Sequence, residues 1–188
     1  MSRNIIARIA TSADGFIARR DGSVDFLNER PRPKGSYGMG EFYRSIDTIL
    51  WGRKTYDVAL DFQRQGVKGA AFDPNVKNYV FSRNPPAAPP PGVEFVSEDV
   101  KSFARRLRAV PGKDIWMMGG GELIASFLDA GEIDAFSIHI VPTLIGEGIP
   151  LLAPRHRRVP LELKELKKFP DGVVQLGYEV RGAESLRE

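Results

Sequence analysis

The sequence contains no cysteine and only 2 histidines. Without thiols the chain can form neither a disulfide framework nor a thiolate metal site, and we expect no bound metal. No apolar run approaches the length of a membrane span, and the first residues enter a strand pattern without a signal peptide. These absences favour a cytoplasmic protein without a membrane partner.

The charges nearly balance, since 27 Lys and Arg residues against 24 Asp and Glu residues leave a formal charge of +3. An excess this small argues against a nucleic-acid partner but is compatible with an anionic small ligand. The apolar and charged fractions, 42% and 27%, are typical of a globular protein. A length of 188 residues predicts one domain, which we place at residues 1–182, with a short tail at residues 183–188.

Three consecutive glycines, Gly119, Gly120 and Gly121, separate an apolar run at residues 115–118 from apolar residues at helical spacing. The run predicts a buried strand, and the spacing predicts a helix that ends at Gly131. Such a turn offers free backbone N–H groups and the positive end of a helix dipole, which suit a phosphate. Ile124 stands where a dinucleotide fingerprint has its third glycine, so a turn that binds nothing is the alternative on this stretch alone.

Two more predicted strands end in residues suited to anions. The strand at residues 48–51 is followed by a glycine, two cations and a hydroxyl: Gly52, Arg53, Lys54 and Thr55. A helix should follow at residues 56–63, with Thr55 available as its N-cap. The cationic pair suits a phosphate monoester, although an ordinary solvated surface is the alternative. The strand at residues 77–81 ends in Ser82 and Arg83.

The remaining periodicities predict an α/β fold. They indicate strands at 4–11, 93–96 and 133–141, helices at 39–45 and from Ser97 or Asp99 to Val110, loops at 28–40 and 142–150, and a hairpin of strands at 161–168 and 173–180. This order describes βα units with an antiparallel end, hence a mixed sheet with helices on both faces. Ligands of open α/β sheets collect outside the carboxyl ends of the strands, so three such ends favour nucleotide binding.

Two polar residues have competing interpretations. Asp14, in the Asp-Gly turn after the first strand, either holds its own backbone in an Asx-type turn or contacts an anion or substrate. His139 lies on the polar side of an alternating strand. We therefore expect His139 to be a partly exposed strand residue rather than a proton donor.

Five segments together carry a family resemblance: residues 10–18, 51–56, 81–83, 116–123 and 142–152. In this order the chain resembles the dihydrofolate reductase-like family. It is more closely similar to the branch typified by the C-terminal reductase domain of the bifunctional riboflavin-biosynthesis deaminase-reductase. The resemblance implies a three-layer α/β/α fold with a mixed, mostly parallel sheet and an antiparallel C-terminal hairpin. It also implies NADPH as hydride donor and a homodimer.

The same resemblance implies roles for individual positions. Ala10 and Ile17 would line the nicotinamide pocket. Gly52, Arg53, Lys54 and Thr55 would bind phosphate, with Arg53 or Lys54 near the 2′-phosphate, while Ser82 and Arg83 would hold the adenosine end. The pyrophosphate would lie against the glycine turn and the helix start: Gly119, Gly120, Gly121, Glu122 and Leu123.

Two departures from the family pattern bear on the substrate. Folate enzymes have a carboxylate on the helix before the Gly-Arg-Lys-Thr strand, but the equivalent residues here are Ser36, Tyr37 and Gly38. Riboflavin-type reductases often have a lysine after the Asp-Gly turn, where this chain has Phe16. The deaminase half is also absent, and a chain without cysteine could not build its zinc site.

The sequence therefore predicts an NADPH-dependent reductase of a pyrimidine- or pterin-like molecule. It resembles the 5-amino-6-(5-phosphoribosylamino)uracil reductase of riboflavin biosynthesis. Dihydrofolate reductase activity and a non-catalytic NADP-binding module are the alternatives. The candidate proton donors are Asp14, Asp25 and Glu41, and water could serve instead.

Overall fold

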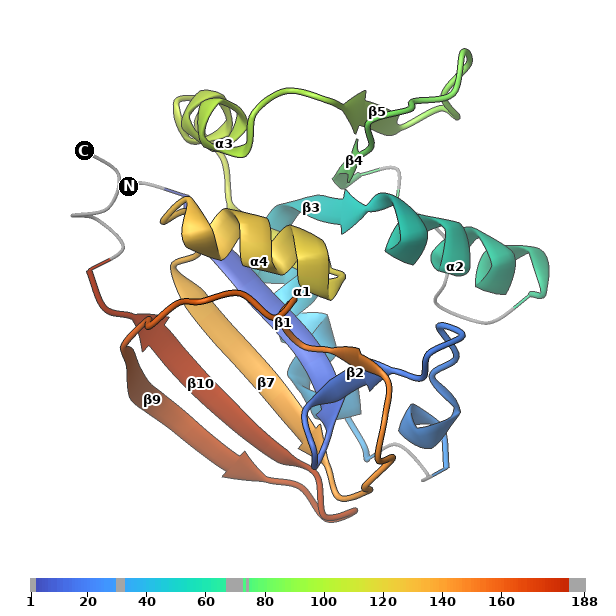
Figure 1. Cartoon of the computed structure of the whole chain (residues 1–188), viewed down its shortest axis with the longest axis vertical. Helices are drawn as coiled ribbons and strands as arrows, with labels where there is room; N and C mark the ends of the chain where they lie inside the picture. Colours follow the sequence, from blue (N-terminus) through green and yellow to red (C-terminus); the bar gives the residue numbers. More distant parts are fainter. Residues whose placement is uncertain (1–2, 30–32, 67–72, 74, 183–188) are drawn as a thin grey trace.

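A computed structural model describes residues 3–29, 33–66, 73 and 75–182 of the chain (Figure 1). Its main feature is an eight-stranded sheet with the order β5-β4-β3-β6-β1-β7-β10-β9. The parallel strands are β1 (Ile5–Ser12), β3 (Ile46–Gly52), β4 (Lys77–Phe81), β5 (Val93–Val96), β6 (Asp114–Gly119) and β7 (Ala135–Val141). Strands β9 (Leu161–Lys168) and β10 (Val174–Val180) form the antiparallel edge. The predicted mixed, mostly parallel sheet with a C-terminal hairpin is confirmed.

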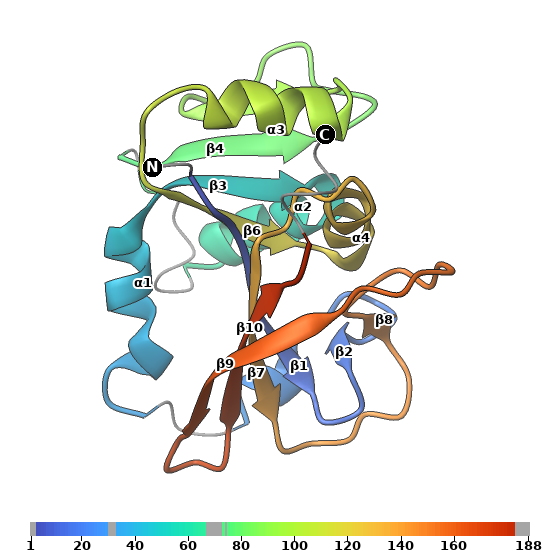
Figure 2. The ribbon, with the colours of Figure 1, turned by 90° about the vertical axis from the view of Figure 1, so that its left-hand side faces the viewer.

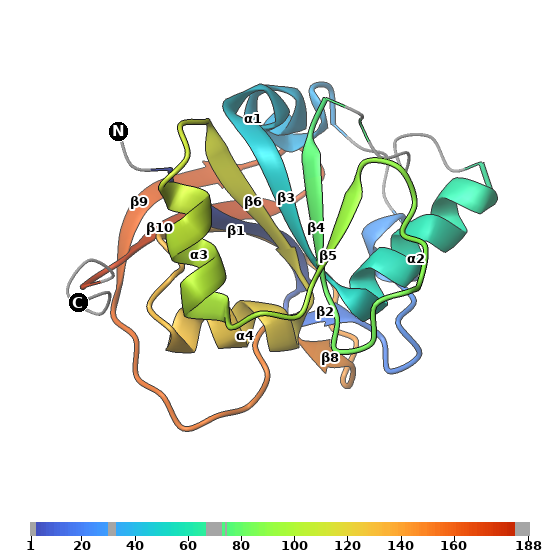
Figure 3. The ribbon, with the colours of Figure 1, turned by 90° about the horizontal axis from the view of Figure 1, so that it is seen from above.

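Helices cover both faces of this sheet, as predicted (Figures 2 and 3). Helices α3 (Val100–Arg108) and α4 (Gly121–Asp129) pack on one face, where Phe103 and Phe127 join Ile5, Ile115 and Met117 in one core. Helices α1 (Met39–Ser45) and α2 (Arg53–Arg64) pack on the other, where the second core contains Phe42, Tyr56, Trp51 and Trp116. Among the described residues, no helix has the length and apolarity needed to cross a bilayer.

The central strands are apolar on both sides because both faces are covered. In β3 the consecutive residues Ile49, Leu50 and Trp51 are all buried, and Leu50 is 0% exposed. Burying one such side chain contributes about 1.5–3 kcal/mol. By contrast, β9 is an edge strand whose Leu163 and Leu166 are 52% and 63% exposed.

Several predicted boundaries were wrong. Helix α2 begins at Arg53 with Gly52 as its N-cap, so Thr55 lies inside the helix and does not cap it. Of the two residues predicted to cap α3, Asp99 is confirmed, since it accepts a hydrogen bond from the Ser102 N–H at 3.0 Å, but the helix ends at Arg108 instead of Val110.

The two predicted loops contain short regular elements. The loop at 28–40 includes the 3₁₀ turn η2 (Ser36–Gly38), its residues 30–32 lie outside the described part of the chain, and η1 (Asp25–Leu27) precedes it. The loop at 142–150 ends in the short strand β8 (Ile149–Pro150), which pairs with β2 (Phe16–Ala18) in a separate two-stranded sheet. The predicted tail at 183–188 also lies outside the described residues.

Candidate functional site

The glycine turn after β6 and the start of α2 are in direct contact. A Cβ atom on Gly52 would lie 3.3 Å from both the carbonyl oxygen of Gly119 and the nitrogen of Gly120. Trp51 pairs with Gly119 across the β3–β6 ladder, and the Gly119–Gly120 peptide is cis. Two of the three strand ends singled out in the sequence therefore form one surface, and glycine is what allows their backbones to meet.

Two helix N-termini converge at this contact. Helix α2 starts after Gly52 and helix α4 starts after Gly120, and neither has a side chain capping its first amides. The first-turn N–H groups of a helix have no intrahelical acceptor and carry the positive end of its dipole. Figures 1 and 3 show the facing ends of α2 and α4. The arrangement suits an anion that bridges the two helices.

Strand β2 and helix α2 also approach the glycine turn at Gly120. A Cβ on Gly120 would lie 3.2 Å from Thr55 Oγ1 and 3.6 Å from Ile17 Cδ1. The side chains of Thr55, in helix α2, and of Ile17, in strand β2, thus both approach the glycine turn. Ala10 is half-buried on β1, which is adjacent to β6 in the sheet. The residues implied for the nicotinamide end therefore lie on elements next to the glycine turn.

Position 121 must be a glycine because the chain after β8 packs against its backbone, and not because a ligand approaches it. A Cβ there would lie 2.5 Å from the carbonyl oxygen of Pro150, and the N–H of Ala153 donates to the Gly121 carbonyl at 3.3 Å. The chain that follows β8 passes directly over this glycine. The side chain of Leu123 is buried in the core, and Glu122 forms an ion pair with Arg155 at 3.0 Å. Gly121, Glu122 and Leu123 can therefore offer a ligand only their main-chain amides.

Cations gather at the carboxyl ends of β3 and β4. These strands are neighbours in which Gly52 pairs with Phe81, so the residues that follow them lie along one edge. Lys54 and Arg83 are exposed and form no ion pair with any other described residue. Ser82 is half-buried, and its hydroxyl accepts a hydrogen bond from the Asn84 N–H at 3.2 Å.

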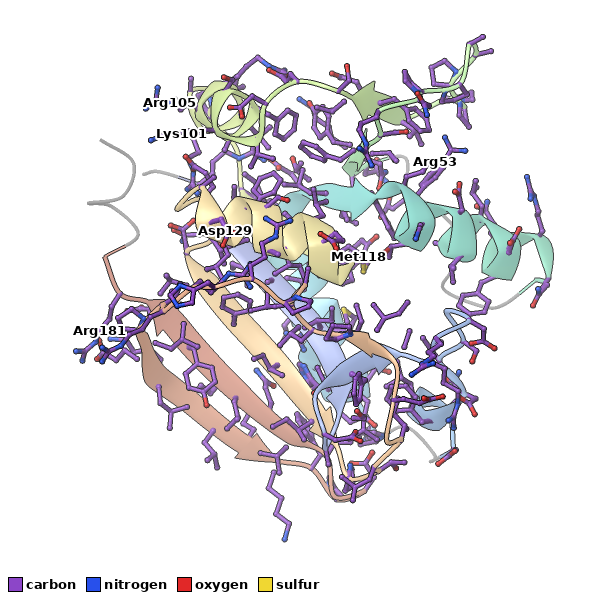
Figure 4. All side chains as sticks on the ribbon, in the orientation of Figure 1. Arg53, Lys101, Arg105, Met118, Asp129 and Arg181 are labelled. Atoms are coloured by element: carbon purple, nitrogen blue, oxygen red, sulfur yellow. The ribbon has the colours of Figure 1, made fainter. Side chains whose placement is uncertain are left out.

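Arg53 is held in place by two partners. Its Nε donates to both carboxylate oxygens of Asp57 at 2.9 Å, and its guanidinium lies 5.5 Å from the ring centroid of Phe95. Figure 4 shows Arg53 beside β5, beyond the end of β3. With the glycine contact and two uncapped helices, these three cations fit a dinucleotide that carries an additional phosphate.

Asp14 holds a distant loop as well as its own turn. Its carboxylate accepts hydrogen bonds from the Ser12 hydroxyl at 2.6 Å, the Gly146 N–H at 2.7 Å and the Ile145 N–H at 3.2 Å. The bond from Ser12, and then those from the loop amides, lower the pKa of Asp14 below its ordinary value. The Asx-type interpretation covered only part of the role of Asp14: besides bonding within its own turn, it ties the β1–β2 turn to the loop at Ile145 and Gly146.

The structure does not bring the three candidate proton donors together. Asp25 is exposed and pairs with Arg19 at 2.7 Å, and this pairing lowers the pKa of Asp25. Glu41 is exposed in the first turn of α1. Asp14, Asp25 and Glu41 lie on three different elements, which are the β1–β2 turn, η1 and α1. The described part of the chain contains no group of three or more His, Cys, Asp or Glu residues that could hold a metal ion.

His139 is buried, so the prediction of a partly exposed residue was wrong. It is 7% exposed, its ring stacks on Phe169 with 6.2 Å between centroids, and Tyr37 meets it edge-on. Burial, and then the positive charge of Arg8, lower the pKa of His139 to about 4. Arg8 is itself buried, and sequence reasoning did not single it out as functional. The available signal was a charged residue inside the apolar pattern of the first strand.

Comparison with known proteins identifies one family model and two relatives that match nearly the whole chain. The RibD C-terminal domain model matches residues 3–175. Uncharacterized protein YwjB of Bacillus subtilis (strain 168) is 36% identical over 179 residues, covering 95% of this chain and 98% of YwjB. Uncharacterized protein YyaP of the same organism is 33% identical over 191 residues, covering 96% of each chain.

Solved structures show the same fold. A putative riboflavin biosynthesis protein from Shewanella sp. PV-4 has a TM-score of 0.82 at 25% identity, with 96% of this chain and 99% of that chain covered. A pyrimidine reductase-like protein from Corynebacterium diphtheriae has a TM-score of 0.64 at 19% identity, with coverages of 95% and 92%. The deaminase/5-amino-6-(5-phosphoribosylamino)uracil reductase from Thermotoga maritima has a TM-score of 0.69 at 19% identity, and this chain spans 57% of its length.

Proposed function

Since the chain belongs to the family of RibD C-terminal domains, we propose that it is a cytoplasmic reductase that uses NADPH to reduce a pyrimidine- or pterin-like ring. Its expected substrate class is that of the 5-amino-6-(5-phosphoribosylamino)uracil reductases. The observation that supports this most is the contact of Gly52 with Gly119 and Gly120, which brings two uncapped helix N-termini together beside the cations of β3 and β4.

In this proposal each group of residues has one task. The first amides of α2 and α4 bind the pyrophosphate, Ser82 and Arg83 hold the adenosine end, and Arg53 or Lys54 binds the 2′-phosphate. Ala10 and Ile17 pack against the nicotinamide and orient it toward the substrate. NADPH, when bound, supplies the hydride, so the chain contributes position and water exclusion.

The reduction also consumes one proton. Asp14 and Asp25 already accept hydrogen bonds as carboxylates, and their partners lower both pKa values. A carboxylate stabilised in its charged form is a poor acid near neutral pH. We therefore propose water as the proton source, with Glu41 as the carboxylate to test first.

Cofactor choice provides the decisive experiment. Calorimetric titration of NADPH and NADH is compared for the wild type, for Arg53→Ala plus Lys54→Ala, and for Arg64→Ala at the far end of α2 as a control. The double variant should lose NADPH affinity by roughly tenfold or more and NADH affinity much less, because only NADPH has the 2′-phosphate. Equal losses for the two cofactors, or no NADPH binding by the wild type, would count against the proposal.

Turnover separates the enzyme from its alternatives. NADPH oxidation is followed with 5-amino-6-(5-phosphoribosylamino)uracil, with dihydrofolate and without substrate. Oxidation with the uracil compound supports the proposed reaction, whereas oxidation with dihydrofolate alone identifies a dihydrofolate reductase. NADPH binding without turnover on a broad panel of heterocycles would identify a non-catalytic NADP-binding module.

We also propose that the protein is a homodimer that pairs through the outer face of β9 and β10. Leu163 and Leu166 are exposed on β9 and pair with Tyr178 and Leu176 of β10. Figure 1 shows these strands extending beyond α4. Light scattering should give a dimer for the wild type and for Leu144→Lys, a control at an exposed leucine outside β9 and β10, but a monomer for Leu163→Lys plus Leu166→Lys.

A further inference from the structure

Arg8 is a buried cation with no carboxylate in contact. It is 8% exposed, its guanidinium carbon lies 4.8 Å from the ring centroid of Phe42, and its Nε has no hydrogen-bond partner. One Nη donates to the main-chain oxygen of Tyr37 and lies 3.4 Å from His139 Nε2. Among the described residues no Asp or Glu forms an ion pair with Arg8.

Two other arginines with little exposure are compensated by carboxylates. Arg3, 4% exposed, forms an ion pair with Asp47, and Arg108 pairs with Asp134 at 2.9 Å. Burying a charge without a partner is costly, because the lost hydration is not replaced. Burial lowers the pKa of Arg8 and the charge of Glu165 acts against this shift, but unlike Arg3 and Arg108, Arg8 has no carboxylate within ion-pair distance in the described part of the chain. A bound ligand could supply one.

The position of Arg8 suits a substrate rather than a core contact. Arg8 and Ala10 are two residues apart on β1 and so point to the same face, about 6.6 Å from each other along the strand. His139 pairs directly with Ala10 across the ladder, and the Trp116 indole N–H donates to the Arg8 carbonyl at 2.9 Å. A heterocycle stacked on a nicotinamide at Ala10 would therefore reach the guanidinium.

The segment over Arg8 has a strained backbone, and the Tyr37 hydroxyl anchors it by donating a hydrogen bond to Asp171 at 2.5 Å. Ser36 and Tyr37 have φ values of 45° and 59°, and Gly35 and Gly38 on either side are also positive. Non-glycine residues in this region carry a conformational cost. Tyr37 offers the guanidinium only a neutral carbonyl, whereas a charged oxygen would form a shorter and stronger hydrogen bond.

We propose that Arg8 binds an anionic oxygen on the substrate ring, so the substrate is a planar heterocycle with a carboxylate or enolate group. This inference rests on the proposed reductase function; among the proposed pyrimidine-like rings it favours those that carry an acidic group over the neutral aminouracil compound and over 2-aminopterins. His139 Nε2 faces the guanidinium as an acceptor and orients it. A 2-aminopyrimidine edge, which presents N–H donors, is repelled by a cation that is itself only a donor.

The test uses three ring probes of similar size: orotate, which carries a carboxylate, neutral uracil, and 2,4-diaminopyrimidine. Each is titrated by calorimetry into the protein with and without NADP⁺. Wild-type protein should bind orotate most tightly, uracil about tenfold more weakly, and the diamine not at all. Arg8→Met should lose roughly 30-fold in orotate affinity, while Arg44→Met, an exposed arginine of α1, should lose none.

Arg8→Lys covers the case in which Arg8→Met does not fold, because it keeps the charge but loses the planar fork. It should retain part of the orotate affinity, and wild-type selectivity is measured regardless. Uracil binding as tightly as orotate, no orotate binding, or unchanged orotate affinity in folded Arg8 variants would each overturn the inference. Failure of wild-type protein to bind NADP⁺ would overturn only the proposed function, since orotate binding to the cofactor-free protein still tests Arg8.

Discussion

Nε of Arg53 donates to both carboxylate oxygens of Asp57, one turn further along α2, at 2.9 Å from each. Both side chains are nearly half exposed, 42% for Arg53 and 46% for Asp57, so the pair is weak. Asp57 thus occupies Nε of the guanidinium to which the proposed 2′-phosphate would bind. A phosphate arriving at Arg53 must compete with Asp57, whose charge also repels it.

We expect Asp57→Asn to tighten NADPH binding by about two- to fivefold, because an exposed ion pair is worth about 0.2–1 kcal/mol. NADH, which has no 2′-phosphate, should bind as before. The measurement is calorimetric titration of both cofactors at low salt. Asp61→Asn serves as the matched control, because Asp61 pairs with Arg64 at the other end of the helix. Equal gains for both cofactors would show that Asp57 does not act through Arg53.

Gly120→Ala tests the glycine contact itself. The added methyl group would lie 3.2 Å from Thr55 Oγ1, and it would fill the space between the two helix starts. Overpacking of this kind lowers the free energy of unfolding by about 1–3 kcal/mol. NADPH affinity should fall by roughly tenfold or more, because the methyl group would stand between the ligand and the first amides of the two helices. Gly40→Ala is the control, since its added methyl would meet only the end of Arg44 at 3.7 Å. Undiminished NADPH binding by Gly120→Ala would show that the ligand does not approach this turn.

The sequence predicted the elements of the fold well because the patterns involved are local. Residues 115–118 are apolar and precede glycines, and β6 and α4 follow the prediction within two residues. The start of α2 was misplaced because Thr55 is the usual kind of cap. Gly52 takes that position because its backbone meets Gly119 and Gly120, a contact between segments more than 60 residues apart.

The errors at the site have the same non-local origin. Strand alternation correctly placed His139 and Phe136 on opposite faces of the strand. It could not show that Tyr37 and Phe169 would cover His139. The acceptor role of Asp14 depends on Gly146, 132 positions along the chain. Likewise, the charge of Arg8 is visible in the sequence, but its burial and its unpaired Nε become apparent only when the whole sheet is assembled.

Asp14→Asn distinguishes a positioning role from a catalytic one. An amide keeps one acceptor oxygen but loses the charge that draws in Ser12, Ile145 and Gly146. We expect a lower Tm and a KM for NADPH raised several-fold, with kcat changed less, because the loop over the glycine turn loosens. Ser12→Ala should reproduce the direction of the effect. A large fall in kcat for Asp14→Asn, with KM unchanged, would instead make Asp14 the proton donor.

His139 should make the fold sensitive to mild acid. Its pKa is about 4 in the folded chain and about 6.5 when unfolded, so below pH 6.5 the unfolded chain binds more protons. Unfolding then becomes easier as the pH falls from 6.5 toward 4, by up to about 3 kcal/mol, and His139 contributes nothing above pH 7. The free energy of unfolding is measured against pH for the wild type, His139→Gln and His156→Gln, since His156 is the exposed histidine. Only His139→Gln should reduce the fall in the free energy of unfolding below pH 6.5. Identical profiles for both variants would show that protonation of His139 does not lower this free energy.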